Sequence, residues 1–206
     1  QKPQIPAAKA TIFELSQESD RQAYEAFLAG LTAYEAFDTL EDQVAELLVT
    51  RNPRLRSNPE GLSDALSLHL GDDGWAHQGC WVWYPWSRTL VRLLNEDEFI
   101  ELRTNRNRNK ITREEQELLR SKQIGIVGLS VGSAFAMSLV MERTCGSLKV
   151  ADFDDLELSN LNRIQTGVKN LGLPKWVSIC RAIAEIDPYF KVDVQTEGLT
   201  SDNAAG

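Results

Sequence analysis

The segment from Lys122 to Lys175 restricts the folds open to this chain more than any other part of the sequence. It opens with an apolar run at residues 123–127, which is typical of a strand buried on both faces. Gly128 and Gly132 follow this run and predict a sharp turn. Because glycine has no Cβ, such a turn lets backbone N–H groups approach a phosphate closely.

A helix and a second strand are predicted after the glycine turn. Apolar residues between 131 and 143 have helical spacing, and Gly146 lies where a C-terminal cap is expected. Residues 147–151 then have the composition of a strand, which ends at Asp152. The separation between Gly128 and Asp152 is close to the roughly 20 residues expected for an acid that binds ribose hydroxyl groups. This order of elements predicts the first half of a nucleotide-binding α/β sheet.

The glycines alone do not establish a nucleotide site. The usual G-x-G-x-x-G pattern would place glycine at positions 130 and 133, and this chain has Ser130 and Ser133 instead. An ordinary strand–turn–helix connection without a ligand therefore stays open at this point.

The loop after the second strand carries a longer motif. It reads DFDDLELSNLNR, and a G-x-P-K segment follows at residues 172–175. Over about residues 104–206, this arrangement closely resembles the ThiF/MoeB/HesA superfamily, the ubiquitin-activating-enzyme-like adenylyltransferases. In that family a strand ends in D-x-D, S-N-L-N/Q-R follows, and a Lys opens the next helix. The positions in register are Asp152, Asp154, Ser159, Asn160, Leu161, Asn162, Arg163 and Lys175.

The resemblance implies a fold, a reaction and a set of partners. The fold is α/β, a Rossmann-like doubly wound and mainly parallel sheet, incomplete at its C-terminal end. The reaction is ATP-dependent adenylation of a carboxylate, on a carrier-protein C-terminus, a peptide or a small molecule. The implied cofactor is Mg²⁺, with its Asp ligand expected beyond residue 206, so the 206-residue chain is expected to be inactive alone. The implied partners are a second copy of the chain and a ubiquitin-like or sulfur-carrier protein.

The chemistry of adenylation explains why these residue types are suitable. A chain-terminal carboxylate has a pKa of about 3.5 and is ionised at neutral pH, so no general base has to activate it. The site instead needs positive charge where two anions meet. Arg163 can form two hydrogen bonds to phosphate oxygens, and Lys175 places a charge at a helix N-terminus. The implied nucleotide-binding residues are Gly128, Ser130, Gly132, Asp152, Asp154, Ser159, Asn160, Arg163 and Lys175, of which Arg163 and Lys175 are also catalytic.

A third catalytic residue is implied upstream of the glycine turn. Residues 104–109 resemble the R-Y-x-R-Q segment of the family, although Asn107 and Asn109 replace the usual aromatic residue and Gln. In the family, the second Arg of this segment reaches into the ATP site of the partner subunit. The matching residue here is Arg108. A solvated basic patch is the alternative interpretation.

Composition excludes several other functions. The net charge of −8 disfavours a nucleic-acid partner, which usually requires a basic face. Cys80, Cys145 and Cys180 form no C-x-x-C pair, and His69 and His77 stand apart, so neither a metal site nor a disulfide framework is expected. No apolar run approaches the roughly 18 residues of a membrane span, so a cytoplasmic location is expected.

The first part of the chain, residues 1–103, is predicted to be a small helical region with a β-hairpin near residues 80–94, preceding a partial nucleotide-binding domain at 104–206. Trp81 and Trp83 alternate with other apolar residues, which predicts aromatic packing in a core rather than a platform for stacking bases. The arrangement also resembles, more loosely, bacterial proteins in which a ThiF-like module precedes a nitroreductase-like flavin domain.

Three functions remain open from the sequence. The first is an adenylyltransferase module. The second is an NAD-binding oxidoreductase domain that uses the same turn and Asp152, although it gives no reason for the S-N-L-N-R motif and Lys175. The third is a catalytically degenerate module that binds partners.

Overall fold

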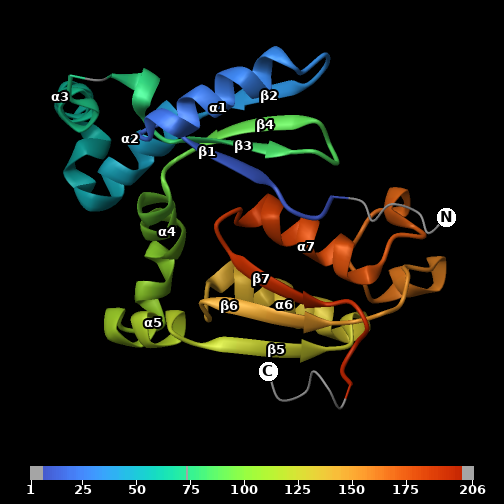
Figure 1. Cartoon of the computed structure of the whole chain (residues 1–206). Helices are drawn as coiled ribbons and strands as arrows, with labels where there is room; N and C mark the ends of the chain where they lie inside the picture. Colours follow the sequence, from blue (N-terminus) through green and yellow to red (C-terminus); the bar gives the residue numbers. More distant parts are fainter. Residues whose placement is uncertain (1–6, 73, 201–206) are drawn as a thin grey trace. The chain divides into compact units, whose positions relative to one another are not determined.

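The computed structural model describes residues 7–72 and 74–200 and divides the chain into two compact units. We call residues 10–106 the N-terminal unit, and residues 107–206 together with residues 1–9 the C-terminal unit. Each unit has its own sheet and core (Figure 1) and is described by itself.

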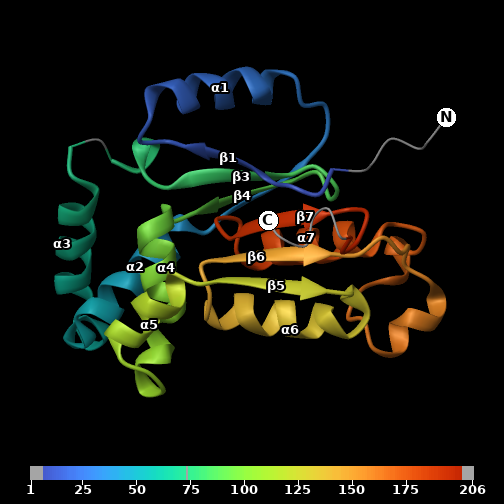
Figure 2. The same ribbon diagram turned by 60° about the horizontal axis from the view of Figure 1, so that its bottom comes forward.

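The C-terminal unit is built on a three-stranded parallel sheet with the order β5-β6-β7. Its strands are β5 (Gln123–Val127), β6 (Ser147–Ala151) and β7 (Lys191–Gln195). Helix α6 (Leu129–Glu142) connects the first two strands, and α7 (Lys175–Ile186) precedes the third (Figure 2). The predicted α/β class with a Rossmann-like parallel sheet is therefore confirmed.

One face of this sheet forms the core of the unit. Leu148 and Val150 of β6 are fully buried, and alternate residues of β5 and β7 pack beside them. Helices α6 and α7 cover this face together, contributing Leu129, Val140 and Ile183 to the same cluster. Burial of each such side chain is worth about 1.5–3 kcal/mol, so this cluster holds the two crossover connections on the sheet.

The prediction that residues 123–127 are buried on both faces is wrong. Exposed and half-buried residues alternate along β5, and Val127 retains 62% of its accessible surface. Within the described residues, β5 pairs only with β6 and so lies at the sheet edge. Ile124 and Ile126 face the helices, whereas Gln123, Gly125 and Val127 face away from the core.

The end of α6 also differs from the prediction. The helix ends with Arg143, which takes the left-handed conformation at φ 49°, and not with Gly146. This conformation is costly for a non-glycine residue. The side chain of Arg143 is held by a buried ion pair with Asp187, and its guanidinium carbon lies 5.7 Å from the ring centroid of Phe190. Gly146 has a different role: a Cβ there would lie within 1.9 Å of the Arg120 carbonyl oxygen, so the backbone approach excludes any side chain.

Shorter elements complete the C-terminal unit. Helix α5 (Arg113–Arg120) begins with a capping box, in which the side chains of Thr112 and Glu115 bond each other's backbone N–H groups. Two 3-10 turns lie between β6 and α7, namely η4 (Leu158–Asn162) and η5 (Val168–Asn170).

The N-terminal unit contains a four-stranded sheet with the order β1-β3-β4-β2. The strands are β1 (Thr11–Glu14), β2 (Glu35–Asp38), β3 (Cys80–Tyr84) and β4 (Thr89–Leu93). β3 and β4 form an antiparallel hairpin, β1 pairs antiparallel to β3, and β2 pairs parallel to β4. The helical elements are α1 (Glu18–Ala29), α2 (Leu40–Arg51), η1 (Pro53–Ser57), α3 (Pro59–Leu70), η2 (Trp75–His77) and α4 (Glu96–Thr104), and η3 (Asn105–Asn109) spans the boundary between the units.

Aromatic side chains pack between α1 and the sheet. Tyr24 stacks on Trp81 with ring centroids 5.7 Å apart, and Phe27 meets Trp83 edge-on at 5.4 Å. Such pairs are worth about 0.5–1.5 kcal/mol beyond the area they bury. These tryptophans therefore belong to the core, as the alternating pattern predicts.

Candidate functional site

The glycine turn between β5 and α6 places two glycines under different constraints. Gly128 has φ 83°, a conformation that favours glycine, and a Cβ on it would meet nothing within 4 Å. The backbone at this point is therefore open to an approaching ligand. Gly132 lies inside α6, where a Cβ would lie 2.6 Å from Cγ2 of Ile126. Its role is to let the helix pack closely on β5. Ser130 accepts a hydrogen bond at its carbonyl oxygen from the Ser133 hydroxyl (3.2 Å), which stays within the helix.

Asp152 joins the end of β6 to the start of α6. One carboxylate oxygen accepts the Leu129 N–H at 2.6 Å, and the other accepts the Asp154 N–H at 2.8 Å. The side chain is buried. A carboxylate at the first N–H of a helix is stabilised by the helix dipole, so Asp152 fixes the glycine turn. Each oxygen retains a lone pair that could accept a ribose hydroxyl, and this contact stays a prediction.

Asp154 and Lys175 form an ion pair at the start of α7. The Lys175 ammonium lies 2.7 Å from a carboxylate oxygen of Asp154, and the Lys175 N–H donates to the Asp154 carbonyl oxygen at 2.9 Å. The Lys175 side chain is 7% exposed, whereas that of Asp154 is 54% exposed. The two acids of the D-x-D motif thus contact different helices, the first at α6 and the second at α7.

The S-N-L-N-R segment forms the η4 turn. The buried Asn160 accepts the Glu157 N–H at its side-chain oxygen (3.1 Å), and the Ser159 hydroxyl donates weakly to the Glu157 carboxylate (3.4 Å). Arg163 is exposed and donates to the Asn162 side-chain oxygen at 2.8 Å and to the Ser159 carbonyl oxygen at 3.4 Å. Asn160 and Ser159 therefore shape the loop, and Glu157 is a partner that the family motif did not indicate.

Arg163 and Lys175 line the same cavity, together with side chains along the length of α6, from Leu129 to Met141, and along α7. The cavity has a volume of about 220 Å³. This volume is below the range of about 300–1,000 Å³ that is usual for small-molecule sites, so it can accommodate only part of a nucleotide. Leu129 and Ser133 form the wall on the α6 side, and Ser178 adds a hydroxyl from α7. Ser133, Ser138, Gln165 and Ser178 are polar lining residues that the sequence did not indicate, and a serine within a helix carries no signal of its own.

The other predicted residues lie around this cavity without lining it. They are Gly128, Ser130, Gly132, Asp152, Asp154, Ser159 and Asn160.

Arg108 is on η3, also outside the cavity, and its exposed side chain makes no hydrogen bond or ion pair with another described residue. The adjacent Asn107 anchors the segment, donating at 2.7 Å to both the Gln116 side-chain oxygen and the Glu142 carbonyl oxygen. Insertion of Arg108 into a partner subunit stays a prediction.

The cysteines are buried. Burial raises the pKa of Cys180 to about 11 and also raises the pKa of Cys145, so both thiols are largely protonated at neutral pH.

Within residues 7–72 and 74–200, no group of three or more His, Cys, Asp or Glu side chains is arranged to hold a metal ion. In the same part of the chain, no helix combines the length and the apolar character needed to cross a membrane.

Comparison with known proteins places this geometry in a family. The ThiF family model matches residues 104–206. Uncharacterized protein MT1398 of Mycobacterium tuberculosis is 48% identical over 123 residues, covering 60% of this chain and 17% of that protein. The tRNA threonylcarbamoyladenosine dehydratase 2 of Saccharomyces cerevisiae is 27% identical over 109 residues, covering 52% of this chain and 24% of that protein. Ubiquitin-like modifier-activating enzyme 5 of Drosophila ananassae is 24% identical over 168 residues, covering 81% of this chain and 36% of that enzyme.

Among solved structures, E. coli tRNA N6-threonylcarbamoyladenosine dehydratase TcdA in complex with ATP is 28% identical, with a TM-score of 0.48 over 51% of this chain and 44% of that chain. The chain spans between 17% and 36% of the length of the curated relatives named above. The family match extends over half of the sequence and includes the whole segment from the glycine turn to Lys175, so this chain belongs to the ThiF family.

Proposed function

We propose that this chain supplies the nucleotide-binding part of an ATP-dependent adenylyltransferase that activates a carboxylate. The observation that carries the proposal is the convergence of Arg163 and Lys175 on one cavity that is lined by α6 and α7. Membership of the ThiF family supports the same class of reaction.

The positive charges of the cavity address the main barrier of the reaction. A carboxylate nucleophile and the α-phosphate of ATP are both anions, so their approach requires charge compensation. Arg163 makes only hydrogen bonds to neutral oxygens, and its exposed guanidinium group can exchange them for phosphate oxygens. The α6 N-terminus and the open backbone at Gly128 add a favourable position for an anion.

Lys175 has to share its charge between Asp154 and the substrate. Its ammonium group is held in place by burial, whereas Asp154 is half exposed and free to turn toward water. ATP binding would therefore displace the Asp154 carboxylate, or add a phosphate oxygen beside it, without moving Lys175. The ion pair stabilises a buried ammonium group that would otherwise be unpaired.

The described residues do not by themselves fit a Mg²⁺ site. Octahedral Mg²⁺ is bound through carboxylates and waters, and within residues 7–72 and 74–200 no suitable group of three ligands is present. We therefore assign no step to the metal. We further propose that the protein acts as a homodimer in the cytoplasm, with Arg108 contributed to the partner's site, and that a ubiquitin-like or sulfur-carrier protein, a peptide or a small molecule supplies the carboxylate.

Calorimetry on the full-length protein tests the nucleotide proposal, with separate titrations of ATP, AMP and NAD. Arg163→Ala should weaken ATP binding at least about tenfold, because a hydrogen bond to a charged group is lost. Lys169→Ala is the matched control: it removes one exposed positive charge from η5, outside the cavity, and should leave ATP affinity unchanged. Wild-type ATP affinity in the Arg163→Ala variant would contradict the proposal. Preferential binding of NAD would favour an oxidoreductase, and a folded protein that binds no nucleotide would favour a degenerate module.

A further inference from the structure

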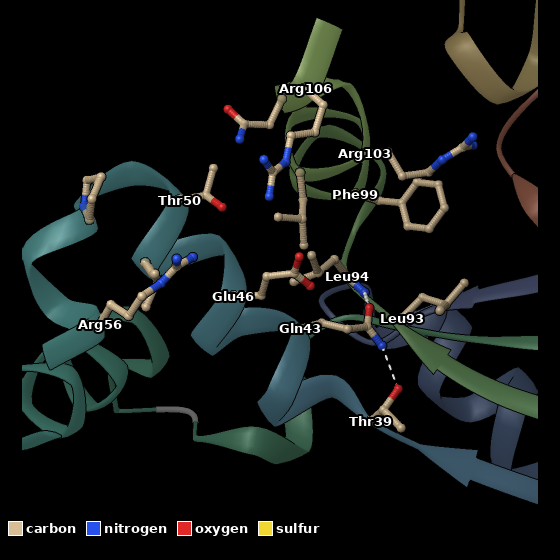
Figure 3. A pocket seen from close by; sticks show the side chains of 14 residues that line it. Thr39, Gln43, Glu46, Thr50, Arg56, Leu93, Leu94, Phe99, Arg103 and Arg106 are labelled. Atoms are coloured by element: carbon tan, nitrogen blue, oxygen red, sulfur yellow. Dashed lines mark hydrogen bonds between the residues drawn. The ribbon is translucent and has the colours of Figure 1, made fainter. Parts of the chain in front are cut away.

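A second, larger pocket lies wholly within the N-terminal unit (Figure 3). Its volume of about 850 Å³ is within the usual range for small-molecule sites. Its lining residues come from α2, η1, the end of β4, α4 and η3. None of its lining residues belongs to the cavity of Arg163 and Lys175.

Two arginines contribute uncommitted positive charge to this pocket. Arg56 comes from η1 and Arg106 from η3, and neither guanidinium group makes a hydrogen bond or ion pair with another described residue. Arg51, only five residues before Arg56, binds both carboxylate oxygens of Glu101 at 3.1 and 2.8 Å. Figure 3 shows Arg106 extending toward Thr50, with Arg56 approaching from the opposite wall. Two unpaired guanidinium groups present planar sets of N–H donors that suit a carboxylate or phosphate.

The remaining charged residues limit the charge of the ligand. Arg103 lines the pocket but lies over Phe99, with its guanidinium carbon 5.8 Å from the ring centroid, and Figure 3 shows it extending away from Thr50. Glu46 lines the pocket and makes no hydrogen bond or ion pair with another described residue. The charge of Arg103 is not neutralised by the ring but extends away from Thr50. Arg56, Arg106 and Glu46 therefore leave one net positive charge on the Thr50 side of the pocket. This balance suits a monoanionic carboxylate better than a phosphate monoester, whose charge at neutral pH is close to −2.

The other side of the pocket is apolar. Leu94, Phe99 and Leu102 line it, and Leu94 belongs to the core cluster of this unit. Gln43 also lines the pocket, but its side chain is committed to the protein. Its amide donates to the Thr39 hydroxyl (2.9 Å) and the Arg92 carbonyl oxygen (3.0 Å), and its oxygen accepts the Leu94 N–H (3.1 Å). The pocket therefore pairs a charged side with an apolar wall whose residues belong to, or pack against, the core cluster.

We propose that this pocket binds a small organic carboxylate with an apolar body. The carboxylate lies between Arg56 and Arg106, within reach of the Thr50 hydroxyl, and the apolar body lies against Phe99 and Leu102. Glu46 disfavours ligands with a second negative charge. The site goes beyond the proposed adenylation, since all of its residues belong to the N-terminal unit.

Ligand-observed NMR and calorimetry on the full-length protein test this site with three probes. The probes are 4-methylpentanoate, the uncharged 4-methylpentanamide of nearly the same shape, and inorganic phosphate. We expect the carboxylate to bind and both other probes to bind at least about tenfold more weakly. Failure of the carboxylate to bind, or equal binding of the amide, would overturn the proposal, as would tighter binding of phosphate.

Variants assign the binding to the two arginines. Arg56→Gln and Arg106→Gln should each weaken 4-methylpentanoate about tenfold, whereas Arg54→Gln should have no effect. Arg54 is an exposed arginine of the same η1 turn that does not line the pocket, so it controls for general charge attraction. Equal weakening by Arg54→Gln would overturn the proposal. Because these side chains are at the surface, unchanged thermal unfolding will confirm folding. ATP titrations of the same variants separate this proposal from the proposed nucleotide site. Both variants should bind ATP normally while they lose carboxylate binding, because neither arginine lines the cavity of Arg163 and Lys175.

Discussion

The two units compensate buried arginines in different ways. In the C-terminal unit, Arg143 and Asp187 are 8% and 0% exposed, and two hydrogen bonds at 2.6 and 3.2 Å join them. In the N-terminal unit, the side chain of Arg92 is 11% exposed, but that of its carboxylate partner Asp38 is 47% exposed. The Arg92 guanidinium group also donates hydrogen bonds to the carbonyl oxygens of Trp75 and Gln78. The first arrangement depends on one acid in a dry interior. The second spreads the charge over neutral groups and water.

This difference predicts unequal costs for removing the two acids. Asp187→Ala leaves Arg143 buried and uncompensated, which should lower the free energy of unfolding by about 3–5 kcal/mol. Asp38→Ala should cost about 1 kcal/mol, because water and two carbonyl groups still solvate Arg92. Urea denaturation measures both, with Trp176 reporting on the C-terminal unit and the remaining tryptophans on the N-terminal unit.

A double variant separates the ion pair from the packing around it. Arg143→Met combined with Asp187→Ala should recover part of the loss, since no unpaired buried charge remains. If Asp187→Ala and Asp38→Ala lowered the free energy of unfolding equally, the two arginines would be compensated to the same extent, which would contradict the difference in burial between the two acids.

A smaller effect is expected at one glycine in each unit. Gly146→Ala should destabilise the C-terminal unit by about 1–3 kcal/mol, because the new Cβ would overlap the Arg120 carbonyl oxygen and the backbone has to move. Gly30, at the end of α1, has φ −89°, and a Cβ there would be 3.5 Å from the Phe27 carbonyl oxygen. Gly30→Ala should therefore be neutral or stabilise the N-terminal unit by about 0.4–1 kcal/mol. Thermal unfolding of both variants measures the difference, and a neutral Gly146→Ala would contradict the close approach.

The C-terminal unit was the easier of the two to predict, for a physical reason. Its parallel strands are joined by helical crossovers, so strand, turn and helix follow one another along the chain and the ends of strands carry the motif. Asp152 and Lys175 could be placed at a strand end and a helix start from the sequence alone. The left-handed Arg143 could not, because its conformation depends on Asp187, which is 44 residues away.

The N-terminal unit depends on pairings that local sequence does not encode. β1 and β2 have four residues each, too few for a clear alternating pattern, and neither was predicted. β2 pairs in parallel with β4, so that Glu35 lies opposite Thr89. The pocket with Arg56 and Arg106 was missed for the same reason, since its walls come from elements that meet only in the folded unit. In the sequence these arginines look like parts of solvated basic segments.

The last predicted effect is confined to alkaline pH, and its pH range differs between the units. Burial raises the pKa of Cys180 from 9.0 to about 11 in the C-terminal unit. Burial, followed by the nearby Tyr34, raises the pKa of Tyr24 from 10.0 to about 12 in the N-terminal unit. In both cases the unfolded chain loses its proton first, so the free energy of unfolding falls as pH rises through the interval between the two values. The stabilising contribution is complete below pH 9 for Cys180 and below pH 10 for Tyr24, and it is lost by about pH 11 and about pH 12.

Two variants isolate these contributions from other groups that titrate in the same range. Cys180→Ala should flatten the decline in stability between pH 9 and about pH 11, and Tyr24→Phe should flatten it between pH 10 and about pH 12. Urea denaturation of each variant and the wild type across this range gives the slopes, and the packing cost of each substitution cancels because it does not vary with pH. A Cys180→Ala protein that keeps the wild-type slope between pH 9 and about pH 11 would mean that the thiol is solvated in the folded state, against its position in the core shared by α6, α7 and β6.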